Sequence, residues 1–425
     1  MADAKLFVEA HRELTRRYFL RLGSAGIAAW STLRLSFAAD PSADLSAQQK
    51  LEQAIAKIEY LTPSADFGNV GRGDPVPSEL PDDQRRAVGL DRDTWQLEVV
   101  PDAESGAKVE QPLSKERGTA FNWEALMRLA EKSAVRYFKV MTCNNINAPL
   151  GMGLWEGLPL RDILWLARPT DNIRRVFYYG YHNEKPEQMF RSSLPLNRVL
   201  EDPSGELPVL VCYKLNGQWL SPKRGGPVRM LVPEAYGFKS VKWLQRIVLT
   251  NNHQANDTYA DANNDIESWQ KTFARFVDAP EDVEPGAPIP LTGLAQVGIG
   301  GLTKVQVALD SSEAAPADDP YFTRLTWRDA DVLPLPPDWS KSLPGGKTPE
   351  MPLQFDPQTG RPREWPLRYT LVHWATIVPG VAAGKYQLRC RTIDLAGHAQ
   401  PLPRPFLKSG RNAIHSVTVN VGDDA

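Results

Sequence analysis

Three cysteines, Cys143, Cys212 and Cys390, carry the most reactive side chains of this 425-residue sequence. Three is an odd number and too few for a disulfide framework, and no Cys-x-x-Cys-His run is present to attach a haem. A thiolate suits a soft or high-valent metal, whereas a cysteine without such a task is usually a small buried apolar side chain. Cys143 follows a short predicted strand, residues 139–142, and opens a loop, a usual place for reactive side chains. Its position alone leaves two interpretations of Cys143 open: a buried structural cysteine, which is the usual case, or a metal ligand.

Two motifs surround or follow this cysteine. Residues 143–145 (Cys-Asn-Asn) precede the run Gly-Leu-Trp-Glu-Gly-Leu-Pro-Leu-Arg-Asp-Ile-Leu at 153–164. Further along stand Arg-Gly-Gly-Pro-Val-Arg at 224–229 and Tyr-Gly-Phe-Lys-Ser-Val-Lys-Trp-Leu at 236–244. In this order they resemble the molybdenum-binding and cofactor-cradling stretches of the sulfite oxidase family. The resemblance implies a molybdenum-molybdopterin cofactor with Cys143 as the protein's ligand to the metal.

The resemblance also assigns further site residues. A pterin cofactor carries a phosphate, which cationic side chains and hydrogen-bond donors can hold. The implied cofactor-binding residues are Arg224, Arg229, Lys239, Ser240 and Lys242, and the implied catalytic residues are Cys143, Arg72 and Tyr259. A solvated basic strand edge is the alternative explanation of the cations.

Departures from the family's pattern concern the substrate. The family's Arg-Asn-His triplet reads Arg-Gly-Asp at 72–74, Arg224 replaces a histidine, and no arginine stands at 146–148. Just upstream of His415 only Lys408 and Arg411 are cationic. An oxyanion needs converging cations, and Asp74 would repel a dianion. Two interpretations stay open: oxygen-atom transfer on a small oxyanion, sulfite by default, or a molybdopterin-binding protein with a diverged, non-sulfite or non-catalytic pocket.

The elements that must position these residues indicate an α+β domain followed by an all-β domain. We expect a helix at 122–138, capped by Asn122, and strands at 95–100, 209–213 and 228–232. A Pro-rich acidic linker at 278–290 predicts a boundary between a molybdopterin-binding domain, 40–277, and a β-sandwich, 290–425. Further predicted elements are a helical leader at 39–59, strands at 302–309, 321–327, 368–377, 386–393 and 414–421, and an insertion at 333–366. The resemblance makes the sandwich an immunoglobulin-like dimerisation domain, and hence the protein a homodimer.

Residues 1–39 are typical of a twin-arginine export signal. Arg16 and Arg17 precede a moderately apolar stretch at 22–37, which ends in Ser-Phe-Ala at 36–38 like a cleavage site. An uncleaved anchor or a chance arginine pair before an amphipathic helix are the alternatives. We expect an exported, periplasmic protein.

Composition and the remaining motifs constrain the partners. A formal charge of -2 and a 42% apolar share give no global attraction to nucleic acid or to an anionic membrane. Without a haem or iron-sulfur motif, electrons would leave through an external carrier, which the resemblance makes a c-type cytochrome. His182, His253 and His373 are candidate acid-base groups, although we expect structural roles for them.

Overall fold

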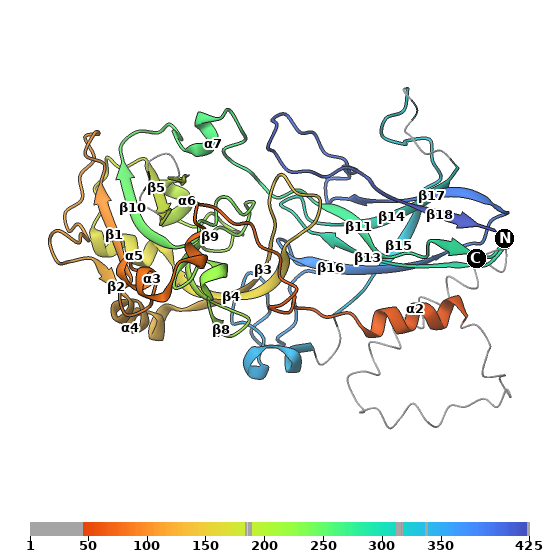
Figure 1. Cartoon of the computed structure of the whole chain (residues 1–425), viewed down its shortest axis with the longest axis horizontal. Helices are drawn as coiled ribbons and strands as arrows, with labels where there is room; N and C mark the ends of the chain where they lie inside the picture. The colour runs from red at the N-terminus through yellow and green to blue at the C-terminus, as the bar shows by residue number, and fades with distance from the viewer. Residues whose placement is uncertain are drawn as a thin grey trace.

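The computed structural model of this protein describes residues 46–182, 185, 189–311, 316, 318–335 and 339–422. Figure 1 shows an elongated molecule, with mixed helices and strands at one end and a region dominated by long strands at the other. The expected signal segment, 1–39, lies outside the described residues. Within the described ranges, no helix is both long and apolar enough to cross a membrane.

The first sheet has the strand order β2-β1-β10-β5-β6. Its strands are β1 (Gln96–Pro101), β2 (Phe121–Asn122), β5 (Arg175–Gly180), β6 (Arg191–Pro195) and β10 (Leu244–Thr250). Strand β1 runs parallel to β10, and the other pairs are antiparallel. Leu97, Val99, Ile247 and Leu249 alternate along β1 and β10 and are fully buried. This alternation is the sequence pattern that predicted the Trp95 strand.

A second sheet carries the cysteine loop. It has the order β3-β4-β7-β8, with β9 also paired to β7. The strands are β3 (Val135–Met141), β4 (Gly151–Pro159), β7 (Leu210–Leu215), β8 (Gln218–Trp219) and β9 (Arg229–Leu231). Helix α5 (Leu160–Ala167) continues β4 and buries Ile163 and Leu164 in the core shared with the first sheet. The hairpin from β3 to β4 thus places residues 142–150 at one edge of the domain.

The predicted helix at 122–138 is too long. Helix α4 (Trp123–Ser133) begins at the expected cap, where the Asn122 side chain accepts from the Ala125 amide at 2.9 Å, but it ends at Ser133. The next residues, Val-Arg-Tyr-Phe-Lys-Val-Met, are rich in β-branched and aromatic side chains and pair with β4 as strand β3. The helical spacing of Tyr137 with earlier apolar residues was therefore misleading.

The C-terminal region is a single path of eight strands, in the order β11-β13-β16-β15-β14-β17-β18-β12. The strands are β11 (Phe273–Asp278), β12 (Asp282–Val283), β13 (Ile289–Gln296), β14 (Lys304–Asp310), β15 (Arg328–Val332), β16 (Leu371–Val378), β17 (Gly384–Ile393) and β18 (His415–Val421). Leu291 and Trp374 on one half of this path share a core with Val305, Leu388 and Cys390 on the other. The region is thus all-β as predicted, while its immunoglobulin-like character stays a prediction.

The structure corrects the expected domain boundary. Strand β11 lies before the Pro-rich linker, yet it pairs with β13 of the C-terminal sheet, so residues 279–288 connect two strands of that sheet instead of separating two domains. Helix α2 (Ala47–Ala56) also packs there, with Leu51 and Ile55 against Leu333 and Ile377 (Figure 1). Helix α2 and strand β11, which lie near the two ends of the expected 40–277 range, therefore belong to the C-terminal region. Their apolar side chains are buried against its strands.

Two further expectations for the C-terminal region need correction. Residues 321–327 form turns, in which Asp319 accepts the Thr323 amide and the Trp327 indole donates to the Phe322 carbonyl, and the strand follows at β15. The insertion at 333–366 lies between β15 and β16 as predicted, but it has apolar anchors. Trp339 and Phe355 pack against Phe138 of strand β3. The insertion therefore joins the two regions.

The remaining helices are short. They are α3 (Asp82–Ala87), α6 (Leu196–Leu200) and α7 (Thr258–Asp261), with 3-10 turns at Pro77–Glu79, Pro222–Arg224, Trp339–Ser342 and Pro344–Gly346. Helix α7 lies at the edge of the first domain that faces the C-terminal region in Figure 1.

Candidate functional site

A cavity of about 320 Å³ lies beside the loop that follows β3. Its volume is in the range of small-molecule sites. Five cationic side chains line it, and no Asp or Glu stands among the lining residues that the structure describes. The cations are Arg72, Arg224, Arg229, Lys242 and Lys408. Such a lining favours an anionic ligand, since a like-charged cluster without a counterion is electrostatically unfavourable.

Cys143 is the thiol that borders this cavity; Cys212 and Cys390 are free and fully buried. The Cys143 Sγ is 2.7 Å from Oδ1 of Asn145. The backbone on either side is held from two directions. The Gly237 amide donates to the Thr142 carbonyl at 2.7 Å, and the Gly410 amide donates to the Asn144 carbonyl at 3.2 Å. A Cβ at Gly237 would stand 2.8 Å from that Thr142 oxygen, so the close approach requires glycine.

The innermost cation is Arg229, on strand β9. Its Nη2 donates to the Ser240 carbonyl at 2.6 Å and its Nη1 to the Arg224 carbonyl at 3.0 Å. Its guanidinium lies 5.4 Å from the centre of the Trp155 ring. Burial, followed by the charge of Arg224, lowers the pKa of Arg229 to about 10, against a raising contribution from Cys212. A bound anion would offset the two contributions that lower this pKa, the burial of the guanidinium and its repulsion by Arg224.

An arm at residues 67–72 closes one side of the cavity through two of the cations. Arg224 donates to the carbonyls of Phe67 and Gly68. Lys242 Nζ donates to Asn69 Oδ1 at 2.6 Å and to the Val70 carbonyl at 2.9 Å. Burial and the charges of Arg229, Arg224 and Lys223 lower the pKa of Lys242 to about 7.

Two predicted cofactor-binding residues have other contacts. Lys239 does not line the cavity: its Nζ donates to the Ser193 carbonyl at 2.8 Å and lies 3.7 Å from Asp257 Oδ2. A turn from Tyr236 to Lys239 aims this side chain to the other side of the loop. Ser240 does line the cavity, but its hydroxyl accepts the Val232 amide at 3.1 Å. Its carbonyl orients Arg229 instead.

The two predicted catalytic residues besides Cys143 also line the cavity. Tyr259, in α7, stacks on Phe238 with ring centres 3.6 Å apart, and burial, followed by the charge of Cys143, raises its pKa to about 12. Arg72 lies over the Phe190 ring, 4.1 Å from its centre. Burial lowers the pKa of Arg72. Asp74, expected to repel a dianion, is not among the lining residues.

Three further residues from separate segments lie at or beside the cavity: Lys408 and His182 line it, and Asn144 stands between the lining residues Cys143 and Asn145. Asn144 is completely buried and joins Tyr259 to the C-terminal region, since its Nδ2 donates to the Lys408 carbonyl at 3.3 Å. Lys408 lies over the Tyr259 ring, whereas Arg411 turns to Asn147. His182 also borders the cavity, although we expected it to be structural. These residues come from distant segments that no motif connects.

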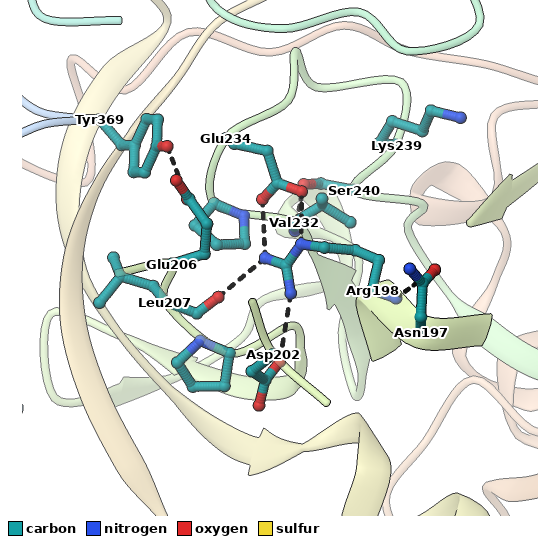
Figure 2. A network of polar contacts seen from close by, with 12 residues as sticks. Asn197, Arg198, Asp202, Glu206, Leu207, Val232, Glu234, Lys239, Ser240 and Tyr369 are labelled. Atoms are coloured by element: carbon teal, nitrogen blue, oxygen red, sulfur yellow. Dashed lines mark hydrogen bonds and ion pairs between the residues drawn. The ribbon is translucent and has the colours of Figure 1, made fainter. Parts of the chain in front are cut away.

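Two buried cations outside the cavity fix the loop that leads to it. In Figure 2, Arg198 makes a double hydrogen bond to Glu234, at 2.7 and 2.9 Å, and contacts Asp202 at 3.1 Å. Lys139 Nζ donates to the carbonyls of Pro233, 2.8 Å away, and Ala235, 3.1 Å away. Burial, against the opposing charge of Glu234, lowers the pKa of Lys139 to about 7. The loop from β9 to Lys242 is therefore anchored on both sides of Glu234.

A wider groove of about 790 Å³ lies on the outer face of β5 and β10. It is lined by Asp102 and Glu104 as well as by Lys185 and Arg191, and it contains no cysteine. Within the described residues no group of three or more His, Cys, Asp or Glu side chains could hold a metal ion. The cavity at Cys143 is thus the better candidate site, since it gathers a thiol and a single sign of charge.

Comparisons with known proteins find similarity to molybdopterin-binding oxidoreductases. The family model described as "Oxidoreductase molybdopterin binding domain" matches residues 86–258. A sulfite oxidase of Gallus gallus is 26% identical over 389 residues, which are 86% of this chain and 71% of that protein. NADPH nitrate reductases of Beauveria bassiana and Fusarium oxysporum are each 34% identical, over 26% and 47% of this chain. The matches span only 12% and 23% of those two proteins.

A solved structure has a similar fold. The crystal structure of the sulfane dehydrogenase SoxCD from Paracoccus pantotrophus superposes with a TM-score of 0.54 and 16% identity. The superposition covers 92% of this chain and 96% of that chain, so it includes the C-terminal strands as well as the first domain.

Proposed function

We propose that this chain is an oxidoreductase of the sulfite oxidase type that transfers an oxygen atom to or from a small oxyanion, sulfite by default. The observation that carries the proposal is the convergence of one thiol and five cations on one cavity. When bound, the cofactor supplies a metal centre that exchanges an oxygen atom and two electrons with the substrate.

The residues around the cavity fit a molybdenum-molybdopterin cofactor. The Cys143 thiol is a suitable soft ligand, and it stands at the cavity wall on a loop held by Gly237 and Gly410. Arg229 and Lys242 have lowered pKa values that an anionic phosphate would raise again. Arg224 and Lys242 would act partly through the arm at 67–72, which they hold over the cavity. Lys239 is not among these cavity residues. Its contacts with Ser193 and Asp257 hold the loop between β9 and Lys242 from outside the cavity.

The substrate would lie at the wall formed by Arg72, Tyr259 and Lys408. The two cations would hold an oxyanion, because charge-assisted hydrogen bonds orient it as well as bind it. The Tyr259 hydroxyl, with its raised pKa, stays protonated at neutral pH. Its one proton, which Asn144 Oδ1 accepts in this structure, would be donated instead to an anionic oxygen of the substrate. A diverged pocket that takes another oxyanion is the alternative, favoured by the missing arginine at 146–148.

The remaining parts of the proposal concern the protein's surroundings. We infer export by the twin-arginine route, a homodimer formed through the C-terminal β-region, and an external one-electron carrier such as a c-type cytochrome. The motifs described above support these three inferences. Cell fractionation, light scattering of the purified protein and reduction of an added cytochrome test them separately.

The direct test is metal and pterin analysis of the purified wild type and of Cys143→Ser. We expect about one molybdenum per wild-type chain and a changed metal absorption in Cys143→Ser, since a hydroxyl replaces thiolate poorly. Cys390→Ser is the matched control, because that thiol is buried in the core of the C-terminal region. Wild-type protein without molybdenum, or unchanged spectra and turnover in Cys143→Ser, would contradict the proposal.

Turnover with an artificial electron acceptor then identifies the reaction. Sulfite oxidation supports the default substrate, and nitrate reduction with an artificial donor supports a reductase. A metallated protein that turns over neither, although its metal can be reduced chemically, supports the alternative of a diverged pocket.

A further inference from the structure

Asn144 is a completely buried polar residue between the cysteine loop and the C-terminal region. Its Oδ1 accepts the Tyr259 hydroxyl at 3.3 Å. Its Nδ2 donates to the Lys408 carbonyl at 3.3 Å and to Ser268 Oγ at 3.5 Å. An amide nitrogen has two hydrogens, so both are used here, and a buried network whose members are all paired is rigid. The side chain of Asn144 is therefore fixed in one orientation.

The segment that Asn144 holds belongs to the connection between β17 and β18. Two contacts join them: the side chain donates to the Lys408 carbonyl, and the Asn144 carbonyl accepts the Gly410 amide at 3.2 Å. The preceding residues, 403–407, are all exposed. A segment that buries few apolar side chains depends on its hydrogen bonds for its position. Asn144 thus fixes the connection at the point where it reaches the cavity.

Lys408 is the residue that this contact places. Of the five cations that line the cavity in the described ranges, it is the one that comes from the C-terminal region. Its Nζ lies 5.7 Å from the centre of the Tyr259 ring. A lysine is a point charge on a flexible stem, so its place at the wall depends on where its main chain is held. The bond from Lys271 Nζ to the Pro403 carbonyl, at 2.6 Å, lies earlier in the connection and does not hold Lys408 directly.

We propose that Asn144 is a positioning residue that holds Lys408 at the substrate wall of the cavity. The inference rests on the proposed function and deepens it, since it states how the C-terminal region takes part in oxyanion binding. Asn144 is not among the lining residues and acts through the Lys408 main chain. When the Tyr259 hydroxyl donates to a substrate oxygen instead, both Nδ2 hydrogen bonds remain. The charge of Lys408 should therefore favour anion binding only while Asn144 is present.

The first experiment measures what Lys408 contributes with and without Asn144. Calorimetric titration of the holoenzyme with inorganic sulfate, a dianion at neutral pH, gives the affinity. Lys408→Met should weaken sulfate binding about tenfold, because a charge-assisted hydrogen bond is lost. In a chain that already carries Asn144→Leu, the same substitution should weaken it less than about threefold. Comparing one substitution in two backgrounds cancels any change that Asn144→Leu makes through Tyr259.

The second experiment follows the connection itself by amide hydrogen exchange of residues 403–411. Asn144→Asp keeps the size of the side chain and the acceptor for Tyr259, but it replaces the donating nitrogen by an oxygen. Exchange should become about tenfold faster in Asn144→Asp and Asn144→Leu, because the segment opens more easily. Ser268→Ala is the matched control: it removes the other acceptor of the same nitrogen and should keep wild-type exchange.

Three results would overturn the proposal. The first is an equal cost of Lys408→Met in the two backgrounds. The second is unchanged exchange in Asn144→Asp, which applies even if Asn144→Leu does not fold. The third is a wild-type holoenzyme that binds no sulfate, or that binds it equally well after Lys408→Met. Molybdenum content of the wild type reports separately on the proposed function.

Discussion

The hydroxyl of Tyr259 lies 3.3 Å from Oδ1 of Asn144, to which it donates a hydrogen bond. Asn144 adjoins Cys143 in sequence and is anchored by the Gly410 amide and the Lys408 carbonyl. The tyrosine is therefore linked to the candidate metal ligand through one buried amide side chain. This link connects three segments far apart in the sequence.

Tyr259→Phe should lower kcat/KM about 10- to 100-fold, the effect of losing a hydrogen bond to a charged group. The pKa of Tyr259 is raised to about 12, so the hydroxyl stays protonated and the loss should be uniform between about pH 6 and pH 10. Steady-state kinetics across this range measure it. Tyr386→Phe, which removes a hydroxyl bound to the Ala382 carbonyl in the C-terminal region, is the control. A loss confined to high pH would show that the hydroxyl titrates, against our assignment.

Arg72→Ala should raise the KM for an oxyanion substrate about tenfold or more while molybdenum content stays unchanged, because one cation of the substrate wall is lost. Arg72 contacts the Phe190 ring. It takes no part in the hydrogen bond that joins Arg229 to the Arg224 carbonyl. Arg92→Ala removes a cation that lies over Trp123 and Trp219, away from the cavity, and serves as control. Equal KM values in the two variants would remove Arg72 from the substrate site.

Lys242 should make anion binding pH-dependent. Its pKa is lowered to about 7 in the ligand-free chain, and an anion would raise it toward the ordinary 10.5. Binding then takes up a proton, and affinity falls as pH rises through this window. Titration of cofactor-free protein with inorganic sulfate, which is a dianion at both about pH 7 and about pH 9, measures the slope, which should be smaller in Lys242→Met. Lys115→Met, exposed on the same domain, should keep it. An equal slope in both variants would contradict the assignment.

The same shift affects stability. Between about pH 7 and pH 10.5 the unfolded chain holds more of the Lys242 proton than the folded, ligand-free chain does. The unfolding free energy of cofactor-free protein should therefore rise with pH across this window, and Lys242→Met should flatten the rise. Denaturant unfolding at several pH values checks both statements.

Glu234→Gln should lower the unfolding free energy by about 3–5 kcal/mol, because Arg198 would stay buried without its main counter-charge. Both residues are less than a tenth exposed. Cofactor content should fall as well, since Glu234 adjoins the two carbonyls that Lys139 holds. Denaturant unfolding measures the first effect. Glu124→Gln, from an exposed pair with Arg128, should cost less than about 1 kcal/mol. Similar losses in both variants would mean that the buried pair is not an anchor.

Local patterns predicted several elements well. Asn122 caps α4 as its type and position suggest, and alternation along β1 marks a half-buried strand. The same patterns failed where pairing overrides propensity. Residues 134–138 continue a helical spacing, but β4 offers them a partner strand. The linker at 279–288 has the composition of a domain boundary, yet β11 pairs across it.

The sequence by itself determined the class of site. Motifs that resemble those of the sulfite oxidase family sufficed to predict a metal-pterin site and to name Cys143, Arg229 and Lys242, because these lie on continuous segments. Only the tertiary structure decided which side chains face the cavity. Lys239 and Lys242 are three residues apart, yet a turn sends one to Asp257 and the other to the arm at Asn69. Arg72, His182 and Lys408 all line it because packing brings distant segments together, and neither composition nor spacing carries that information.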